Sequence, residues 1–154
     1  MTKTEQEQID ALVIQYNAFR EEFIEKEDAA LIEFDLSNKL LRECITGHIK
    51  LQHSWMRFSR EIEKYAHRLE AKCDSVYGKC MIYIKKTSPI SYSATEIKHA
   101  VEAQTNYIEF RHQYDNYKNL SDRCKDIVKV IDQRYWSLKE IANLAIHGQD
   151  NYII

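Results

Sequence analysis

The 154-residue sequence contains only three glycines and one proline. A β-rich chain of this length needs such residues at regular intervals to turn between its strands. Their scarcity therefore excludes a β-rich fold and predicts an all-α protein. The same scarcity argues against a loop that cradles phosphate groups, because neither G-x-x-x-x-G-K-[ST] nor G-x-G-x-x-G occurs.

Features of membrane and secreted proteins are also missing. No apolar run approaches the roughly 18 residues that a membrane-spanning helix requires. Residues 1–10 are polar and acidic, which predicts no signal peptide. Three of the four cysteines lie at helical spacing on apolar stripes, where cysteine acts as a small hydrophobic residue. We therefore expect reduced thiols in a cytoplasmic protein. The cysteines are Cys44, Cys73, Cys80 and Cys124.

Motifs for catalysis or metal binding are few. Glu96 with His99, and Glu109 with His112, form two E-x-x-H pairs with the spacing of di-metal carboxylate bundles. Those bundles take the pairs from two facing helices. Here both pairs are expected on one helix, about 20 Å apart and on nearly opposite sides. We therefore expect no metal, no cofactor and no enzymatic activity, and a metal-dependent bundle enzyme is the least favoured hypothesis.

The most extensive pattern is an apolar stripe over residues 51–83. Its members recur every three or four residues, as on one side of a helix. A helix of this length is about 50 Å long, more than a compact monomer of this size covers. We therefore expect other helices, and other subunits, to pack along it. The stripe consists of Leu51, Trp55, Phe58, Ile62, Tyr65, Leu69, Cys73, Val76, Cys80 and Tyr83.

Shorter patterns predict the remaining helices. A first, acidic helix is expected over residues 4–30, and Ser37 can cap a short second helix that weakens near Gly47. The long helix should end before Pro89. A capping box at residues 93–96 begins either one very long helix or two helices with a polar junction. The expected fold is thus an extended helical bundle or hairpin.

Charge is distributed unevenly along the chain. Residues 1–36 hold 3 basic and 10 acidic residues, whereas residues 48–86 hold 9 basic and 4 acidic residues. Such asymmetry favours a charged partner for the basic segment, although charge runs are often only solvated helix faces. Four cations share one helix face, and Lys85 lies nearby. These four are Arg68, Lys72, Lys79 and Lys86.

Tyrosines accompany these cations in the sequence. Single-stranded nucleic acid is bound by cations that contact phosphates and by aromatic rings that stack on bases. Tyr83 could serve in this way, but its place on the apolar stripe favours a core position. The sequence therefore predicts a single-strand-binding face that contains Arg68, Lys72, Lys79, Tyr83, Lys85 and Lys86.

Several motifs together resemble the UvsY-like family of phage recombination mediators. Residues 34–40 (FDLSNKL) look like the family's F-x-x-S-x-K-L, residues 68–71 (RLEA) are similar to its R-I-E-A, and residues 131–141 (IDQRYWSLKEI) resemble its I-x-x-R-x-(aromatic)-x-I-K-x-I. The match covers about residues 34–147. The family's basic Lys-Ala-Arg motif falls on residues 78–80, where only Lys79 is basic.

The resemblance implies a function and an assembly. It implies a ring-like homo-oligomer in the host cell cytoplasm, built largely by C-terminal helices, that binds single-stranded DNA, a single-strand-binding protein and a RecA-like recombinase. Residues 1–33 would form an acidic extension to a domain of residues 34–154. Arg134 lies in an apolar stripe, so we expect it to pair with a carboxylate across an interface. The expected interface residues are Ile127, Ile131, Arg134, Leu138 and Ile141.

The leading hypothesis is therefore a non-enzymatic mediator that helps the recombinase replace the single-strand-binding protein on DNA. The alternative is a structural helical scaffold whose basic face docks on an acidic protein surface, including its own N-terminal helix. The opposite charges of residues 1–36 and 48–86 make the second hypothesis reasonable.

Overall fold

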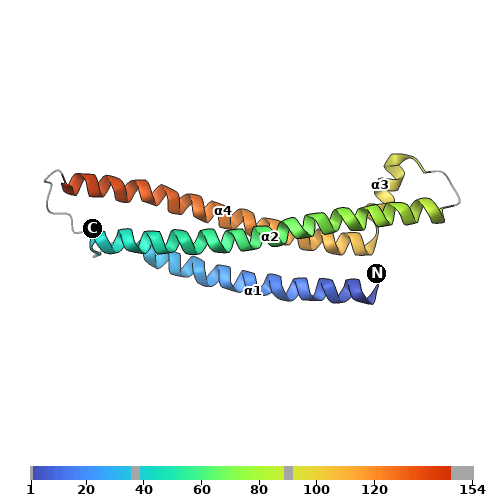
Figure 1. Ribbon diagram of the computed structural model, residues 1–154, viewed down its shortest axis with the longest axis horizontal. Helices are drawn as coiled ribbons and strands as arrows, with labels where there is room; N and C mark the ends of the chain where they lie inside the picture. Colours follow the sequence, from blue (N-terminus) through green and yellow to red (C-terminus); the bar gives the residue numbers. More distant parts are fainter. Residues whose placement is uncertain (1, 36–38, 89–91, 147–154) are drawn as a thin grey trace. The chain divides into compact units, whose positions relative to one another are not determined.

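The structure, a computed structural model, describes residues 2–35, 39–88 and 92–146, with side chains described to residue 144. Within these ranges the chain forms four α-helices and no strand (Figure 1), which confirms the predicted all-α fold. Ser37 and Pro89 lie outside the described residues. The helices are α1 (Lys3–Phe34), α2 (Leu41–Thr87), α3 (Ala94–Glu102) and α4 (Thr105–Ile146).

The chain divides into two compact units. Unit 1 contains Met1–Phe19 and Ile62–Leu120, and unit 2 contains Arg20–Glu61 and Ser121–Ile154. Helices α1, α2 and α4 therefore contribute to both units, whereas α3 belongs to unit 1. Helix α1 supplies buried side chains to both units, among them Ile9 in unit 1 and Phe23 in unit 2. The division into an acidic extension of residues 1–33 and a domain of residues 34–154 stays a prediction.

Unit 1 is organised around Tyr117 of α4. Its ring stacks on Tyr65 of α2 with centroids 5.6 Å apart and meets Phe19 of α1 edge-on at 6.2 Å. Its hydroxyl donates a hydrogen bond of 2.9 Å to the Leu12 carbonyl. Three helices thus meet at one ring whose polar atom is satisfied, as a buried tyrosine requires. Burial raises the pKa of this hydroxyl well above its usual value.

Unit 2 has a comparable aromatic core. Trp55 of α2 is fully buried, and its ring meets Phe23 of α1 at 5.4 Å and Phe58 at 6.0 Å, both nearly perpendicular. The Arg123 guanidinium of α4 lies 4.4 Å from the centroid of Phe23 and covers the outer side of the cluster. The same three helices therefore bury their apolar sides in this unit too.

The prediction of two helices on either side of Gly47 was wrong, because α2 is continuous from Leu41. Cys44, three residues before Gly47, and His48, directly after it, are both at least 98% buried. A glycine inside a helix costs only about 1 kcal/mol, so the burial of these neighbours outweighs it. The absence of a side chain also leaves room for Glu33, whose carboxylate would lie 2.6 Å from a Cβ at position 47.

The predicted apolar stripe of α2 is correct except near its end. From Trp55 to Cys80 its members are buried or half-buried. Tyr83, expected in the core, is instead 63% exposed, and the neighbouring Ile84 is buried. After Cys80 the stripe can continue three residues later at Tyr83 or four residues later at Ile84. In the structure Ile84 takes the buried position.

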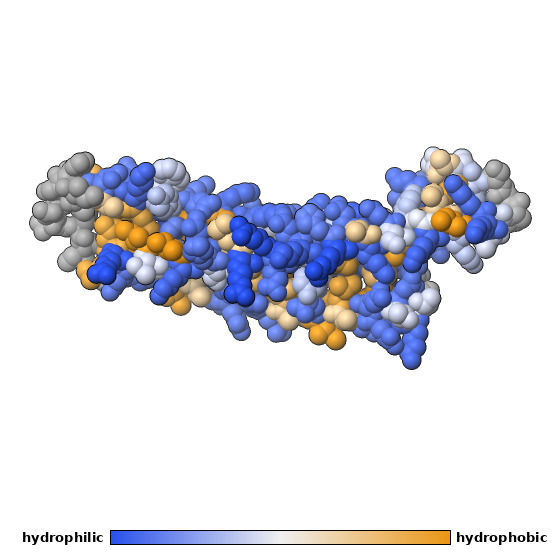
Figure 2. Space-filling view, in the orientation of Figure 1, coloured by the Kyte–Doolittle hydropathy of each residue, from blue (hydrophilic) through white to orange (hydrophobic). Residues whose placement is uncertain are grey.

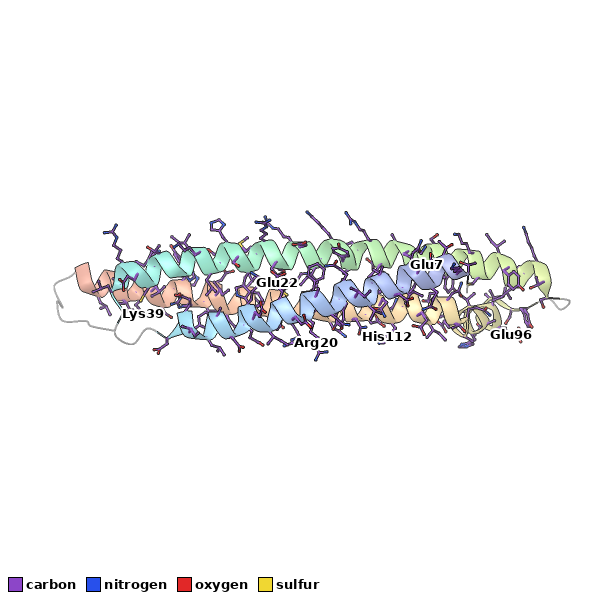
Figure 3. The ribbon with its side chains drawn as sticks, turned by 90° about the horizontal axis from the view of Figure 1, so that it is seen from below. Glu7, Arg20, Glu22, Lys39, Glu96 and His112 are labelled. Carbon is purple, nitrogen blue, oxygen red and sulfur yellow. The ribbon has the colours of Figure 1, made fainter. Side chains whose placement is uncertain are left out.

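The capping box at residues 93–96 is confirmed. The Ser93 hydroxyl accepts from the Glu96 N–H, and the Glu96 carboxylate accepts from the Ser93 N–H at 2.8 Å, at the start of α3 (Figure 3). Thr2 and Glu5 form the same reciprocal pair at the start of α1. Between α3 and α4, the Gln104 N–H donates to the Val101 carbonyl, and α3 ends there. Of the two arrangements predicted after residue 93, the structure therefore has two helices and not one very long helix.

This break also corrects the expectation that both E-x-x-H pairs lie on one helix. Glu96 and His99 belong to α3, and Glu109 and His112 belong to α4. The Glu96 carboxylate is engaged at the helix cap, and His99 lies 3.6 Å from the Glu102 carboxylate. Across the described ranges, no group of three or more potential ligand side chains is placed to hold a metal.

Gly78 offers a direct test of α2 in unit 1. It is an interior helical residue, and a Cβ added to it would meet no atom within 4 Å. Gly78→Ala should therefore raise the free energy of unfolding by about 1 kcal/mol, measured by urea denaturation. Gly47→Ala is the control, since its methyl group must displace the Glu33 carboxylate, and its gain should be smaller. A destabilised Gly78→Ala variant would contradict this arrangement.

His48 makes the stability of unit 2 depend on pH. Neither ring nitrogen of this buried side chain has a hydrogen-bond partner among the described residues. Burial lowers the pKa of His48, Arg134 lowers it further, and Asp132 acts in the opposite direction. The folded state therefore binds this proton less readily than the unfolded state. The free energy of unfolding should therefore be highest above pH ~6.5 and decrease as the pH drops below that value.

His48→Leu should remove this component of the pH dependence. The measurement is the urea midpoint of both proteins between pH 7.5 and 5, a range above the ordinary pKa values of most carboxylates. The wild-type midpoint should fall more steeply than that of the variant. Parallel curves would show that His48 is protonated equally easily in both states.

Candidate nucleic-acid interface

Four cations form a straight row on α2 within unit 1. They are Arg68, Lys72, Lys79 and Lys86, which we call the basic row. With about 100° of rotation per residue, all four point within about 40° of one another around the helix axis. The continuity of α2 from residue 62 to residue 87 keeps this alignment, because no described residue of the segment departs from the helix.

The carboxylates of the same segment lie on the other side of α2. Glu63, Glu70 and Asp74 are about 120–160° from Arg68 around the helix axis. Arg68, Lys79 and Lys86 are exposed, and Lys72 is partly buried. Throughout the described ranges, no carboxylate lies within ion-pair distance of any member of the basic row. The row is therefore an uncompensated strip of positive charge.

Two further residues of the predicted face have different positions. Tyr83 points about 60° from the row and exposes 63% of its surface, so its ring can meet a ligand that lies along the row. Lys85 is exposed but points about 100° away. The structure thus brings five of the six predicted residues onto one side of α2 and leaves Lys85 beside it.

Helix α1 contacts the row through a neutral side chain. Lys72 Nζ donates to the Gln8 Oε1 atom of α1 at 3.0 Å. Lys72 Nζ also lies 4.9 Å from the ring centroid of Phe110, and the Arg68 guanidinium lies 5.8 Å from that of Tyr65. The cations are thus held by an amide and by aromatic rings, which leave their charge uncancelled.

A groove of about 430 Å³ opens beside the first two cations of the row. Residues of α1 form one wall, residues of α2 form the other, and Phe110 of α4 lies in the floor. None of its described lining residues is acidic. We call it the α1–α2 groove. Its lining residues are Gln8, Ala11, Leu12, Gln15, Tyr65, Arg68, Leu69, Lys72 and Phe110.

Sequence reasoning found the cations of this groove but missed the rest of it. Gln8, Ala11 and Gln15 lie more than 50 residues before Arg68 in the chain, and Phe110 lies about 40 residues after it. The period of α1 places Ile9, Leu12 and Phe19 towards the core, but it does not state which part of α2 they face. The opposing wall could therefore not be predicted from spacing alone.

The residues expected at a subunit interface lie on α4 in unit 2. Ile131 and Leu138 are almost fully covered by unit 2 itself, and Ile127 and Ile141 are partly covered. A contact with another subunit is not described by a single chain, so the interface assignment stays a prediction. These side chains already contribute to the core of their own unit.

Arg134 has its partner within the same unit. Its Nη2 atom donates to the Glu33 carbonyl of α1, and its guanidinium lies 5.5 Å from the ring centroid of Phe34. Burial lowers the pKa of the guanidinium. Nε and Nη1 are buried with no hydrogen-bond partner among the described atoms. Within the chain Arg134 is therefore held by a backbone carbonyl, and its pairing with a carboxylate across a subunit interface stays a prediction.

Unit 2 also carries an apolar surface where the first turns of α2 lie beside the last turns of α4 (Figure 2). Ile49 and Tyr135 are about half exposed there, and the adjacent Trp136 exposes 63% of its surface. Exposed apolar surface of this kind often marks a protein–protein contact. This surface was not singled out from the sequence.

The cysteines behave as structural residues. All four are unpaired and buried, in agreement with the expectation of reduced thiols. Burial raises the pKa of Cys73 to about 11 and that of Cys124 to about 12, so both stay protonated near neutral pH. A protonated buried thiol is a poor nucleophile.

None of the described helices is both long and apolar enough to cross a membrane.

Comparison of the chain with known protein families, with curated proteins and with solved structures gave no match.

Proposed function

We propose that this protein binds single-stranded DNA along the basic row of α2. The observation that supports this proposal most is the sorting of charge around α2 in unit 1. Cations occupy one side and have no ion-pair partner among the described residues, carboxylates occupy the other side, and the exposed ring of Tyr83 lies beside the cations. A polyanion with stacked bases matches both parts of this surface.

The alternative, a scaffold whose basic face docks on its own acidic N-terminal helix, has less support. Such docking predicts ion pairs between carboxylates of α1 and the basic row. In the described structure α1 instead meets the row through Gln8. The carboxylates of α1 that do form ion pairs use other partners, such as Glu27 with Arg123 and Glu33 with Lys39 (Figure 3 labels Lys39).

The cellular role follows from the resemblance to UvsY-like recombination mediators. In this role the protein carries out no catalysis and needs no cofactor. It holds the DNA strand, displaces a single-strand-binding protein and seats a RecA-like recombinase. A homo-oligomeric ring would repeat the basic row around its circumference. Several weak sites that bind one strand raise its overall affinity without any new type of contact.

The salt dependence of binding tests this proposal. Each phosphate neutralised on a single strand contributes roughly −0.7 to the slope of log K against log salt concentration. Lys79→Ala combined with Lys86→Ala should therefore weaken oligo(dT) binding and make the slope less steep by about 1.4 per subunit that contacts the strand. Fluorescence anisotropy between about 50 and 300 mM salt provides the measurement.

The matched control removes two lysines elsewhere. Lys98 and Lys129 are exposed and lie near the carboxylates of Glu102 and Asp126. Lys98→Ala combined with Lys129→Ala gives the same change in net charge and should leave the slope unchanged. No affinity of the wild type for oligo(dT) at low salt, or equal effects of the two double variants, would refute the proposed site.

Assembly is tested separately. If unit 2 supplies the contact between subunits, Trp136→Ser should lower the native mass measured by light scattering, because it removes exposed apolar surface from that contact. Tyr83→Ser is the control, since Tyr83 has the same 63% exposure but lies in unit 1. An unchanged mass for Trp136→Ser, with a lowered mass for Tyr83→Ser, would place the contact on unit 1 instead.

A further inference from the structure

We infer that the α1–α2 groove is a base-binding site, which takes one nucleobase of the bound strand while the adjoining phosphate lies on Arg68 and Lys72. This inference rests on the proposed binding of single-stranded DNA. It adds a site for the base, whereas the basic row by itself accounts only for phosphate contacts. It also assigns a function to α1, which lies outside the predicted single-strand-binding face.

The first argument is the chemistry of the groove. Ala11, Leu69 and Phe110 give it an apolar interior, and its volume of about 430 Å³ falls within the range of small-molecule sites. A groove that only guided a phosphate backbone would need cations and no such interior. A flat aromatic base, by contrast, gains from leaving water for an apolar slot.

The second argument is the position of the polar groups. Gln8 and Gln15 lie on the α1 wall, and Arg68 and Lys72 lie on the α2 wall. A glutamine amide offers both donors and an acceptor, as the edge of a nucleobase does. Cations on the opposite wall can hold the phosphate that is covalently linked to that base. The glutamine amides of one wall thus suit the edge of the base, and the cations of the other wall suit its phosphate.

The third argument is charge. No carboxylate lines the groove, and neither Arg68 nor Lys72 has an ion-pair partner in the described ranges. An anion therefore enters without displacing an internal salt bridge. The contacts of Lys72 with Gln8 and Phe110, two other lining residues, fix the position of its ammonium before any ligand arrives. A prepositioned cation loses less side-chain freedom on binding.

Ala11 provides a way to fill the groove without changing its charge. It is exposed, lies on the α1 wall, and is replaced by methionine at little cost to the helix. Ala11→Met should lower the affinity for oligo(dT) by roughly tenfold, the scale of one lost base contact. The slope of log K against log salt should not change, because the phosphate contacts remain. Ala18→Met, an exposed alanine of α1 outside the groove, is the control.

A second ligand separates the base from the phosphate. An oligonucleotide of equal length with abasic sugars keeps every phosphate and lacks every base. The wild type should bind it more weakly than oligo(dT), and Ala11→Met should narrow that difference while leaving abasic binding unchanged. Ala18→Met should behave as the wild type with both ligands.

The outcomes distinguish this inference from the proposed function. If oligo(dT) binds the wild type in a salt-dependent manner but Ala11→Met binds it equally well, the groove holds no base and the inference is overturned, although DNA binding stands. If Ala11→Met lowers the affinity for oligo(dT) and for the abasic strand by the same factor, the inference is also overturned. The groove would then contact the sugar-phosphate backbone and not the base. If neither strand binds at low salt, the proposed function itself fails.

Discussion

The apolar side of α2 is the constraint on which both units depend. In unit 1 the ring of Tyr65 packs against Phe19 of α1 and Tyr117 of α4. In unit 2 the ring of Trp55 packs against Phe23 of α1. A long helix with only one apolar side is not stable alone, so most of its stability comes from this packing. The core therefore determines which side of α2 remains at the surface. In unit 1 that surface carries the basic row.

Residues of different kinds occupy different sides of α2, and this arrangement matters for function. Packing occupies the side with Cys73 and Val76, carboxylates occupy a second side, and cations occupy a third. Like charges aligned on one helix face repel one another, so an uncompensated row costs some stability unless a ligand is present. Binding of a polyanion would relieve this repulsion, and the same anion would meet Tyr83 and the α1–α2 groove along its path.

The sequence was sufficient for features that depend on local periodicity. The stripe from Trp55 to Cys80 and the basic row repeat at helical spacing, the capping box at Ser93 is a four-residue motif, and the structure agrees with each. Errors arose where two local solutions were nearly equal in energy. Gly47 could end a helix or be carried within it, and either Tyr83 or Ile84 could continue the stripe. Tertiary burial decides such cases, and periodicity does not describe it.

Features formed by distant segments could not be predicted. The Arg134 guanidinium is held by a carbonyl 101 residues earlier in the chain, and the α1–α2 groove joins Ala11 to Phe110. Charge patterns indicated only that residues 1–36 and 48–86 could attract one another. At the basic row these two segments meet through the neutral amide of Gln8. The acidic residues of α1 therefore do not neutralise the row, and its positive charge remains available to a ligand.

We propose that a DNA strand lies along the basic row. Photo-crosslinking with an oligonucleotide that contains 5-iodouracil tests it most directly, because the activated base reacts with a neighbouring aromatic ring. Tyr83 beside the row and Trp136 on unit 2 are equally exposed, at 63%. If the strand lies along the basic row, adducts form at Tyr83 and disappear at high salt. Adducts at Trp136 with none at Tyr83 would contradict it.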